Sequence, residues 1–161
     1  NFGKMALSLE YEDLPPATAL GIIRLIEAYQ IKIEGLNVVV IGRSNLVGKP
    51  TAIMLMNRNA TVTVCYSKTK DVASFCRNAD MIIAAAGAPH LVKDDWVKEG
   101  AIVIDAGFSK VNGKSVGDID YDTVAPKCSF ITPVPGGVGP MTIYGILENT
   151  VKAAERQLHN P

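Results

Sequence analysis

The segment Gly42–Pro50 reads GRSNLVGKP and combines residue types that can hold phosphate groups. Gly42 closes a short β-branched run, and the next helix is expected to begin near Gly48. Backbone amides that are free at the start of a helix attract phosphate, and a glycine turn between a strand and a helix is typical of dinucleotide sites. The spacing departs from G-x-G-x-x-G, so a plain turn beside a solvated arginine remains the alternative. The predicted contacts are Gly42, Arg43, Ser44, Val47 and Gly48.

The next predicted strand end indicates which nucleotide would bind. NAD sites usually carry an acidic residue about 20 positions after the glycine loop, where it holds the ribose hydroxyls. Here the chain continues Tyr-Ser-Lys-Thr-Lys, and no acid precedes Asp71. Hydroxyls and cations suit a 2′-phosphate, and Arg43 offers a planar fork of donors. The pattern favours NADP over NAD, unless Lys68 and Lys70 are simply solvated.

A second glycine-rich segment, Pro133–Thr142, reads PVPGGVGPMT. Its first two prolines stiffen the entry, its glycines allow close backbone contact, and Pro140 suits the first turn of a helix. Such a loop could cover a nicotinamide ring, with Thr142 adding a hydroxyl. A tight turn between strand and helix is the alternative.

No residue set in the chain is a credible proton carrier or metal centre. Tyr66 and Lys70 have the Tyr-x-x-x-Lys spacing, but they follow a strand directly and so lie in a loop at the adenosine end, away from hydride transfer. The three cysteines form no C-x-x-C pair, and the two histidines are far apart, so we expect no disulfide and no metal. We therefore expect no catalytic residue here.

Composition limits the class of protein. The 161 residues carry 16 basic and 16 acidic side chains, so no global charge points to nucleic acid or to a membrane surface. Hydrophobic residues make up 48%, and the longest apolar run is far below the roughly 20 residues of a membrane span. The unpaired cysteines favour a reducing compartment, and we expect a cytoplasmic location, with an organelle matrix as the alternative. The first residue is Asn1, which suggests that an N-terminal part has been lost.

Alternating short apolar runs and helical patterns predict a doubly wound α/β fold of the Rossmann type, with a mostly parallel sheet in three layers. Ligands in such sheets lie beyond the carboxyl ends of the strands, where Gly87 and Gly107 stand here. A first helix is expected to be capped by Thr18 and to end at Gly35. Strands are predicted at 37–41, 61–65, 81–85, 101–105 and 129–132, and further helices at 48–58, 71–77 and 141–158.

Four strings in this order resemble the methylenetetrahydrofolate dehydrogenase/methenyltetrahydrofolate cyclohydrolase family: GRSNLVGKP, SKT at 67–69, VGDI at 116–119 and PVPGGVGPMT. The resemblance covers essentially the whole chain. It implies that residues 1–16 are a linker after an absent folate-binding catalytic domain, and that 17–161 form the NAD(P)-binding domain. It also implies that Gly42, Arg43 and Ser44 hold the cofactor phosphates and that Ser67 joins Arg43 at the 2′-phosphate. Phe108 would contact the cofactor through its backbone, and the loop Pro135, Gly136, Gly137, Val138 and Gly139 would line the nicotinamide and the folate cleft.

The resemblance implies oxidation of 5,10-methylenetetrahydrofolate by hydride transfer to NADP, followed by hydrolysis of the methenyl product to 10-formyltetrahydrofolate. The chain alone is expected to bind cofactor without turnover and to form a homodimer. Two other hypotheses are a non-catalytic dimerisation module and another Rossmann NADP oxidoreductase, such as a shikimate or quinate dehydrogenase. The sequence departs from the family pattern at Ala17 and Ala19, at Tyr66 in place of a usual histidine, and at Ser109.

Overall fold

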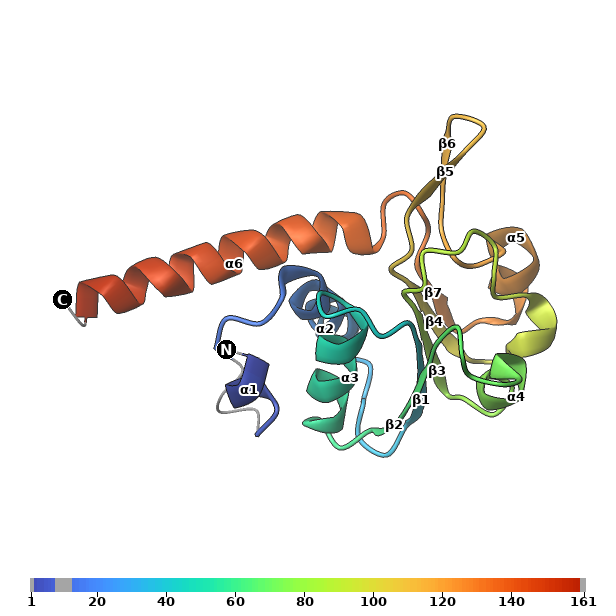
Figure 1. Ribbon diagram of the computed structural model, residues 1–161, viewed down its shortest axis with the longest axis horizontal. Coiled ribbons are helices and arrows are strands. Elements are labelled where there is room, and N and C mark those ends of the chain that lie inside the picture. Colours follow the sequence, from blue (N-terminus) through green and yellow to red (C-terminus); the bar gives the residue numbers. More distant parts are fainter. Residues whose placement is uncertain (1, 8–12, 160–161) are drawn as a thin grey trace.

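A computed structural model describes residues 2–7 and 13–159, and its centre is a five-stranded parallel sheet (Figure 1). The strand order is β2-β1-β3-β4-β7. The chain moves outward from β1 to β2 and then returns to β3 on the other side of β1. This reversal creates the switch point at which open α/β sheets bind ligands. The strands are β1 (Asn37–Ile41), β2 (Thr61–Cys65), β3 (Met81–Ala84), β4 (Ile102–Asp105) and β7 (Phe130–Ile131).

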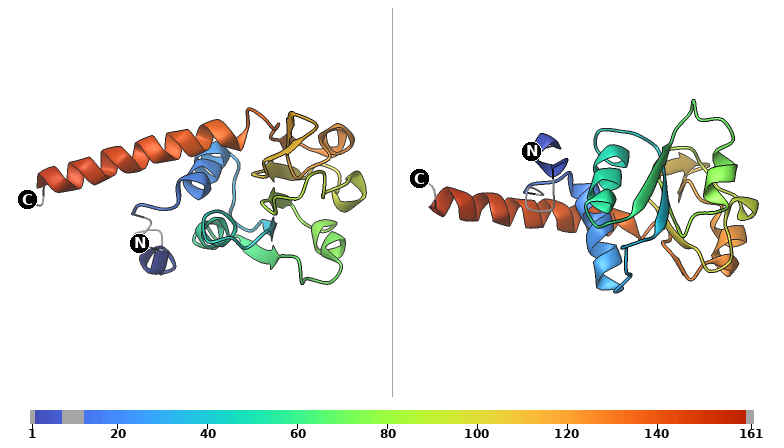
Figure 2. Two further views of the ribbon diagram at one scale, coloured as in Figure 1. Left: turned by 45° about the horizontal axis from the view of Figure 1, so that its top comes forward. Right: turned by 90° about the horizontal axis from the view of Figure 1, so that it is seen from below.

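Helices cover both faces of the sheet, which gives the three layers that the sequence predicts (Figures 1 and 2). One face packs against α2 and α3, and the opposite face against α4, α5 and the 3-10 turn at Asp94–Trp96. A short hairpin, β5–β6, stands at one end of the sheet. The helical elements are α1 (Phe2–Met5), α2 (Ala17–Ala28), α3 (Gly48–Met56), α4 (Val72–Cys76), η2 (Asp94–Trp96), α5 (Tyr121–Val124), η3 (Ala125–Lys127) and α6 (Val138–His159), and the hairpin strands are β5 (Ser109–Val111) and β6 (Lys114–Val116).

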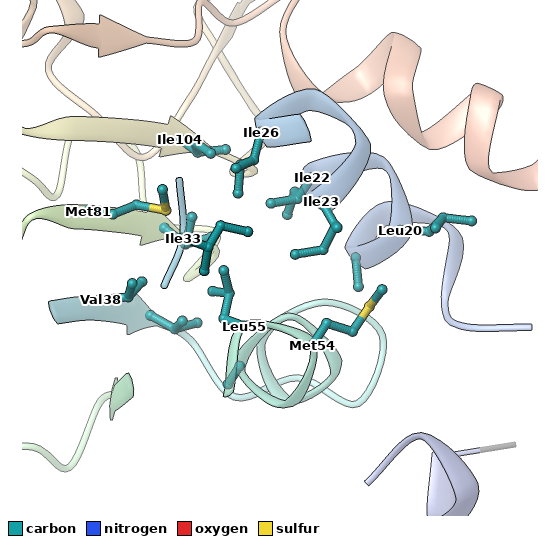
Figure 3. Packing of buried hydrophobic residues seen from close by; sticks show 14 of the residues in the cluster. Leu20, Ile22, Ile23, Ile26, Ile33, Val38, Met54, Leu55, Met81 and Ile104 are labelled. Atoms are coloured by element: carbon teal, nitrogen blue, oxygen red, sulfur yellow. The ribbon is translucent and has the colours of Figure 1, made fainter. Parts of the chain in front are cut away.

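The sheet residues alternate between two hydrophobic cores. On the α2/α3 side, Val38, Met81 and Ile104 meet Ile23 of α2 and Leu55 of α3 (Figure 3). On the other side, the intervening strand residues pack toward α4 and α5. Because both faces are covered, β1 and β3 lack polar alternation, as expected for buried parallel strands. The removal of this apolar surface from water stabilises the sheet that carries the loops described below.

The α/β prediction is confirmed, but the expected limits of the first helix were wrong. Thr18 is not the cap; Pro16 precedes the helix, and its carbonyl accepts a hydrogen bond from the Leu20 amide at 3.0 Å. The helix ends at Ala28 instead of Gly35 because Gln30 adopts a left-handed conformation (φ 55°). The amides at positions 30 and 31 then bond back to the carbonyls of residues 27 and 26, which is a Schellman ending.

The last helix, α6, begins at Val138, three residues before its expected start, and projects away from the sheet (Figure 1). Its first half is held against α2 by Arg24, whose guanidinium donates to both carboxylate oxygens of Glu148 at 2.6 and 2.9 Å. The Asn149 side chain also donates to the carbonyl of Pro15 at 2.7 Å. Several apolar side chains of α6 remain exposed, namely Ile143, Tyr144, Ile146, Leu147, Val151 and Leu158.

Candidate nucleotide-binding site

Two glycines after β1 are required by close backbone packing. Gly42 has a φ of +121°, and a Cβ there would lie 2.1 Å from the carbonyl oxygen of Ala85. A Cβ at Gly48 would lie 2.1 Å from the carbonyl oxygen of Gly42. The loop is therefore folded tightly onto itself and onto the end of β3. It stands at the switch point between β1 and β3, where a dinucleotide would cross the sheet edge.

Ser44 accepts hydrogen bonds from the amides at the start of α3, and this revises the expectation that those amides are free. Its Oγ accepts hydrogen bonds from the amides of Val47 (3.1 Å) and Gly48 (3.3 Å), and its carbonyl accepts from the amide of Lys49 at 3.0 Å. The amides at positions 43–46 make no hydrogen bond within the part of the chain that the structure describes. The loop itself, and not the first turn of α3, therefore offers free donors to a phosphate.

The end of β2 brings Arg43 and Ser67 to the same corner. Ile41 pairs with Cys65 in the parallel register, so the residues that follow each strand are neighbours. The Arg43 guanidinium carbon lies 4.1 Å from the centre of the Tyr66 ring. Thr69 closes a turn, because its hydroxyl accepts from the Tyr66 amide at 3.0 Å and its amide donates to the Tyr66 carbonyl at 2.8 Å. Ser67 and the following lysine are exposed at the tip of that turn.

Asp71, the first acid after β2, is committed to a structural role. Its carboxylate accepts a hydrogen bond from the amide of Ser74 at 3.2 Å and caps α4. Its own backbone is left-handed, with a φ of 47°. Among the described residues of this corner, no other carboxylate follows β2 before α4. The corner thus presents a guanidinium and hydroxyls, a set that suits a 2′-phosphate better than a free ribose hydroxyl.

Two buried aspartates organise the other loops, and sequence reasoning missed both. Asp118 is 0% exposed and accepts hydrogen bonds from three successive amides, those of Ala86 (2.6 Å), Gly87 (2.9 Å) and Ala88 (2.8 Å). Asp105, 3% exposed at the end of β4, accepts from the amides of residues 107, 118 and 119 at 2.9–3.0 Å. The pair therefore ties the loop after β3 to the loop after β4.

The same pair explains why Gly107 must be glycine. A Cβ there would lie 2.2 Å from the Asp118 carboxyl carbon, and a Cβ at Gly117 would lie 1.9 Å from an Asp105 oxygen. Burial raises the pKa of Asp105 above its ordinary value, and the neighbouring Asp118 adds to this, although the three backbone donors act in the opposite direction. Gly107, predicted as a cofactor contact, thus packs against a carboxylate inside the protein. Gly87 is exposed beside the same carboxylate.

A crevice of about 430 Å³ lies beyond the carboxyl ends of β4 and β7. The Thr142 hydroxyl contacts the Thr18 hydroxyl at 3.1 Å and the Val138 carbonyl at 3.3 Å. In the loop, the Gly137 amide donates to the Pro133 carbonyl at 3.0 Å. A second, apolar hollow of about 360 Å³ lies on the other side of the same loop, against Tyr29 and Phe130. The predicted residues that line the crevice are Val47, Gly107, Phe108, Pro135, Gly136, Gly137, Val138, Gly139 and Thr142.

The remaining predicted residues, Gly42, Arg43, Ser44, Gly48, Ser67 and Gly87, do not line this crevice. They lie in the loops after β1, β2 and β3, further along the same sheet edge. The predicted set therefore divides into one group in the loops after β1, β2 and β3 and a second group that lines the crevice. Tyr66 and Lys70, the pair with the Tyr-x-x-x-Lys spacing, follow β2 and so lie with the first group.

Residues 2–7 and 13–159 hold no cluster of three or more histidine, cysteine or carboxylate side chains able to bind a metal ion. None of the helices described is both long and apolar enough to cross a membrane.

Comparison with known proteins assigns the chain to a family. The profile described as the tetrahydrofolate dehydrogenase/cyclohydrolase NAD(P)-binding domain matches residues 16–158. The "Bifunctional protein FolD" of Campylobacter concisus is 53% identical over 159 residues, which are 98% of this chain and 56% of that protein. The chain thus spans about half the length of the curated relatives it matches.

Solved structures agree with this comparison. The bifunctional FolD dehydrogenase/cyclohydrolase of Campylobacter jejuni superposes with a TM-score of 0.94 at 52% identity, over 96% of this chain and 55% of that one. The Trypanosoma brucei enzyme, solved in complex with NADP and an inhibitor, gives a TM-score of 0.92 at 40% identity, over 98% of this chain and 56% of that one.

Proposed function

The chain belongs to the tetrahydrofolate dehydrogenase/cyclohydrolase NAD(P)-binding domain family, and we propose that it binds NADP for the oxidation of 5,10-methylenetetrahydrofolate. This assignment excludes the alternative of a shikimate or quinate dehydrogenase. The observation that carries the NADP proposal is the corner after β2, where Arg43 and Ser67 are available and Asp71 is used as a helix cap. The T. brucei relative, which was solved with NADP, supports the same choice.

The described residues fit the cofactor along the whole sheet edge. Arg43 and Ser67 would bind the 2′-phosphate, and the free amides at 43–46 the diphosphate. The crevice beside Phe108 and Gly137 would receive the nicotinamide. When bound, NADP supplies the acceptor for a hydride, and the protein contributes orientation and exclusion of water.

The second part of the proposal concerns the division of labour in the whole enzyme. Residues 1–16 would connect the domain at 17–161 to a folate-binding catalytic half that carries the proton-transfer groups. Two observations support this: the chain spans only 56% of its relative, and α6 exposes Ile143, Leu147 and Val151 to solvent, where an apolar partner would cover them. The chain alone is then expected to bind NADP, but neither to oxidise methylenetetrahydrofolate nor to hydrolyse the methenyl product. A cytoplasmic location accords with this role.

Isothermal titration of the purified chain tests the proposal. We expect saturable NADP binding that is tighter than NAD binding, and no turnover with 5,10-methylenetetrahydrofolate in an absorbance assay for NADPH. Equal affinity for the two nucleotides would contradict the assignment of the 2′-phosphate corner. Turnover by the chain alone would contradict the division of labour.

A specific observation also favours self-association. The edge strand β7 has only two residues, and beside it an apolar hollow is lined by Tyr29, Ile31, Ile102 and Phe130. Tyr29 and Phe130 meet edge to face with ring centres 5.9 Å apart. A homodimer through this edge would remove an exposed apolar surface and an unpaired strand edge. Light scattering with and without NADP tests it; a dimer that does not bind NADP would instead support the hypothesis of a dimerisation module.

A further inference from the structure

The contact between Tyr66 and Arg43 has a geometry that leaves the arginine donors free. The guanidinium carbon lies 4.1 Å from the ring centre, so the cation interacts with the face of the aromatic ring. The five N–H donors of a guanidinium lie in one plane, and contact with the face of one ring leaves donors for a further ligand. Arg43 forms no ion pair with any carboxylate in the described chain. The Tyr66 ring thus contacts the Arg43 guanidinium, and no ion pair among the described residues occupies its N–H donors.

The backbone of Tyr66 is held in a tight turn. Tyr66 follows the last residue of β2, and Thr69 bonds to both its amide and its carbonyl, so two hydrogen bonds of a tight turn fix its backbone position. Tyr66 is half-buried, whereas Arg43 is exposed. An exposed arginine without such a support would sample many rotamers, and ordering them on binding would lower the affinity.

We propose that Tyr66 is a positioning residue that holds Arg43 in place for the 2′-phosphate and so sets the preference for NADP over NAD. The proposal rests on the proposed function, because it needs NADP in the site. It assigns a role to a position where this chain departs from the histidine usual in the resembling family. The ring acts only through Arg43, and the phosphate that Arg43 binds is absent from NAD. Loss of the ring must therefore weaken NADP and leave NAD unchanged.

The test compares NADP and NAD affinities of Tyr66→Leu, Tyr66→Phe and the unmodified chain by isothermal titration at one ionic strength. Leucine keeps apolar bulk in the turn but has no π face, and we expect it to raise the Kd for NADP by about fivefold, from the lost stacking and the added ordering cost. The Kd for NAD should stay within about a factor of two, because NAD lacks the 2′-phosphate that Arg43 would bind. Phenylalanine keeps the ring and should restore wild-type NADP affinity. Tyr121→Leu on α5, which lines neither hollow, is the matched control.

The outcomes separate the proposal from its premise. If the unmodified chain binds NADP tightly but Tyr66→Leu weakens NADP and NAD in equal proportion, the ring supports the adenosine or the local fold, and the positioning role is wrong. An unchanged NADP affinity in Tyr66→Leu likewise overturns it while leaving NADP binding intact. If the unmodified chain binds neither nucleotide, the proposed function itself fails. Circular dichroism of each variant confirms that the comparison is made between folded proteins.

Discussion

Replacing Asp118 with asparagine tests whether the buried carboxylate holds the loops of the site together. One Asp118 oxygen accepts from the amides of Ala86 and Gly87, and the other accepts from that of Ala88. A carboxamide can keep its oxygen at the first position, but its NH₂ group then faces the Ala88 amide, donor against donor. Asp118→Asn therefore loses one charge-assisted bond and leaves one backbone donor unsatisfied.

The magnitude follows from these contacts. A hydrogen bond to a charged group contributes about 1.5–3 kcal/mol, and an unsatisfied partly buried donor costs about 1–3 kcal/mol. Removal of the repulsion that helps to raise the pKa of Asp105 offsets part of this loss. We expect the free energy of unfolding to fall by about 2–4 kcal/mol, which corresponds to a Tm decrease of roughly 4–16 °C for a domain of this size.

Urea denaturation, followed by circular dichroism and by the fluorescence of Trp96, the single tryptophan, measures the change. The matched control is Asp120→Asn, two residues away, where a partly exposed carboxylate pairs with Lys93 at 2.9 Å. That surface pair should contribute less than about 1 kcal/mol. If Asp118→Asn costs no more than the control, the three amide contacts do not stabilise the loops and the reasoning is refuted.

Three further predictions concern the contact between α2 and α6, the glycine loop after β1 and the start of α6. Arg24 lowers the pKa of Glu148 from 4.5 to about 2 by hydrogen bonding, so this contact stabilises the fold above pH about 5 and is lost as the pH falls toward 2. Glu148→Gln should therefore reduce the difference between urea midpoints measured at pH 7 and pH 3.5, and an unchanged difference would contradict the assignment. Gly42→Ala should cost about 3 kcal/mol or more, because it combines a positive φ with a clash against the Ala85 carbonyl. Gly139→Ala has open space for its Cβ, so it should preserve thermal stability while weakening NADP binding in the crevice; a large loss of stability would show that the loop is packed differently.

The local sequence pattern was sufficient to predict the strands of the sheet, because strand formation here depends on neighbouring residues in the chain. The runs at 37–41 and 61–65 are β-branched, and glycine turns follow where backbones approach closely, so the strands and the Gly42 loop were predictable. The β5–β6 hairpin was not anticipated, although Asn112-Gly113, both with positive φ, is the usual signal for such a turn. That signal was present in the sequence and could have found the hairpin.

The aspartates were not predictable in the same way. Asp118 bonds to amides about 30 residues earlier in the chain, and Asp105 bonds to amides up to 14 residues later. Because the partners are backbone groups, their residue types carry no complementary pattern. The predicted end of α2 was wrong for a different reason. Gln30 adopts the left-handed conformation that ends the helix, whereas glycine is the residue most often found there, so the sequence pointed to Gly35.

The segment Pro133–Pro140 separates the crevice beyond β4 and β7 from the apolar hollow beside β7. Pro133, Gly136, Gly137 and Pro140 line both the crevice and the apolar hollow beside β7. A ligand that orders the segment Pro133–Pro140 from one side therefore also orders the lining of the cavity on the other side. Thermodynamic reciprocity then requires that a molecule seated against Phe130 and one seated against Phe108 change each other's affinity by the same factor, if either changes it at all.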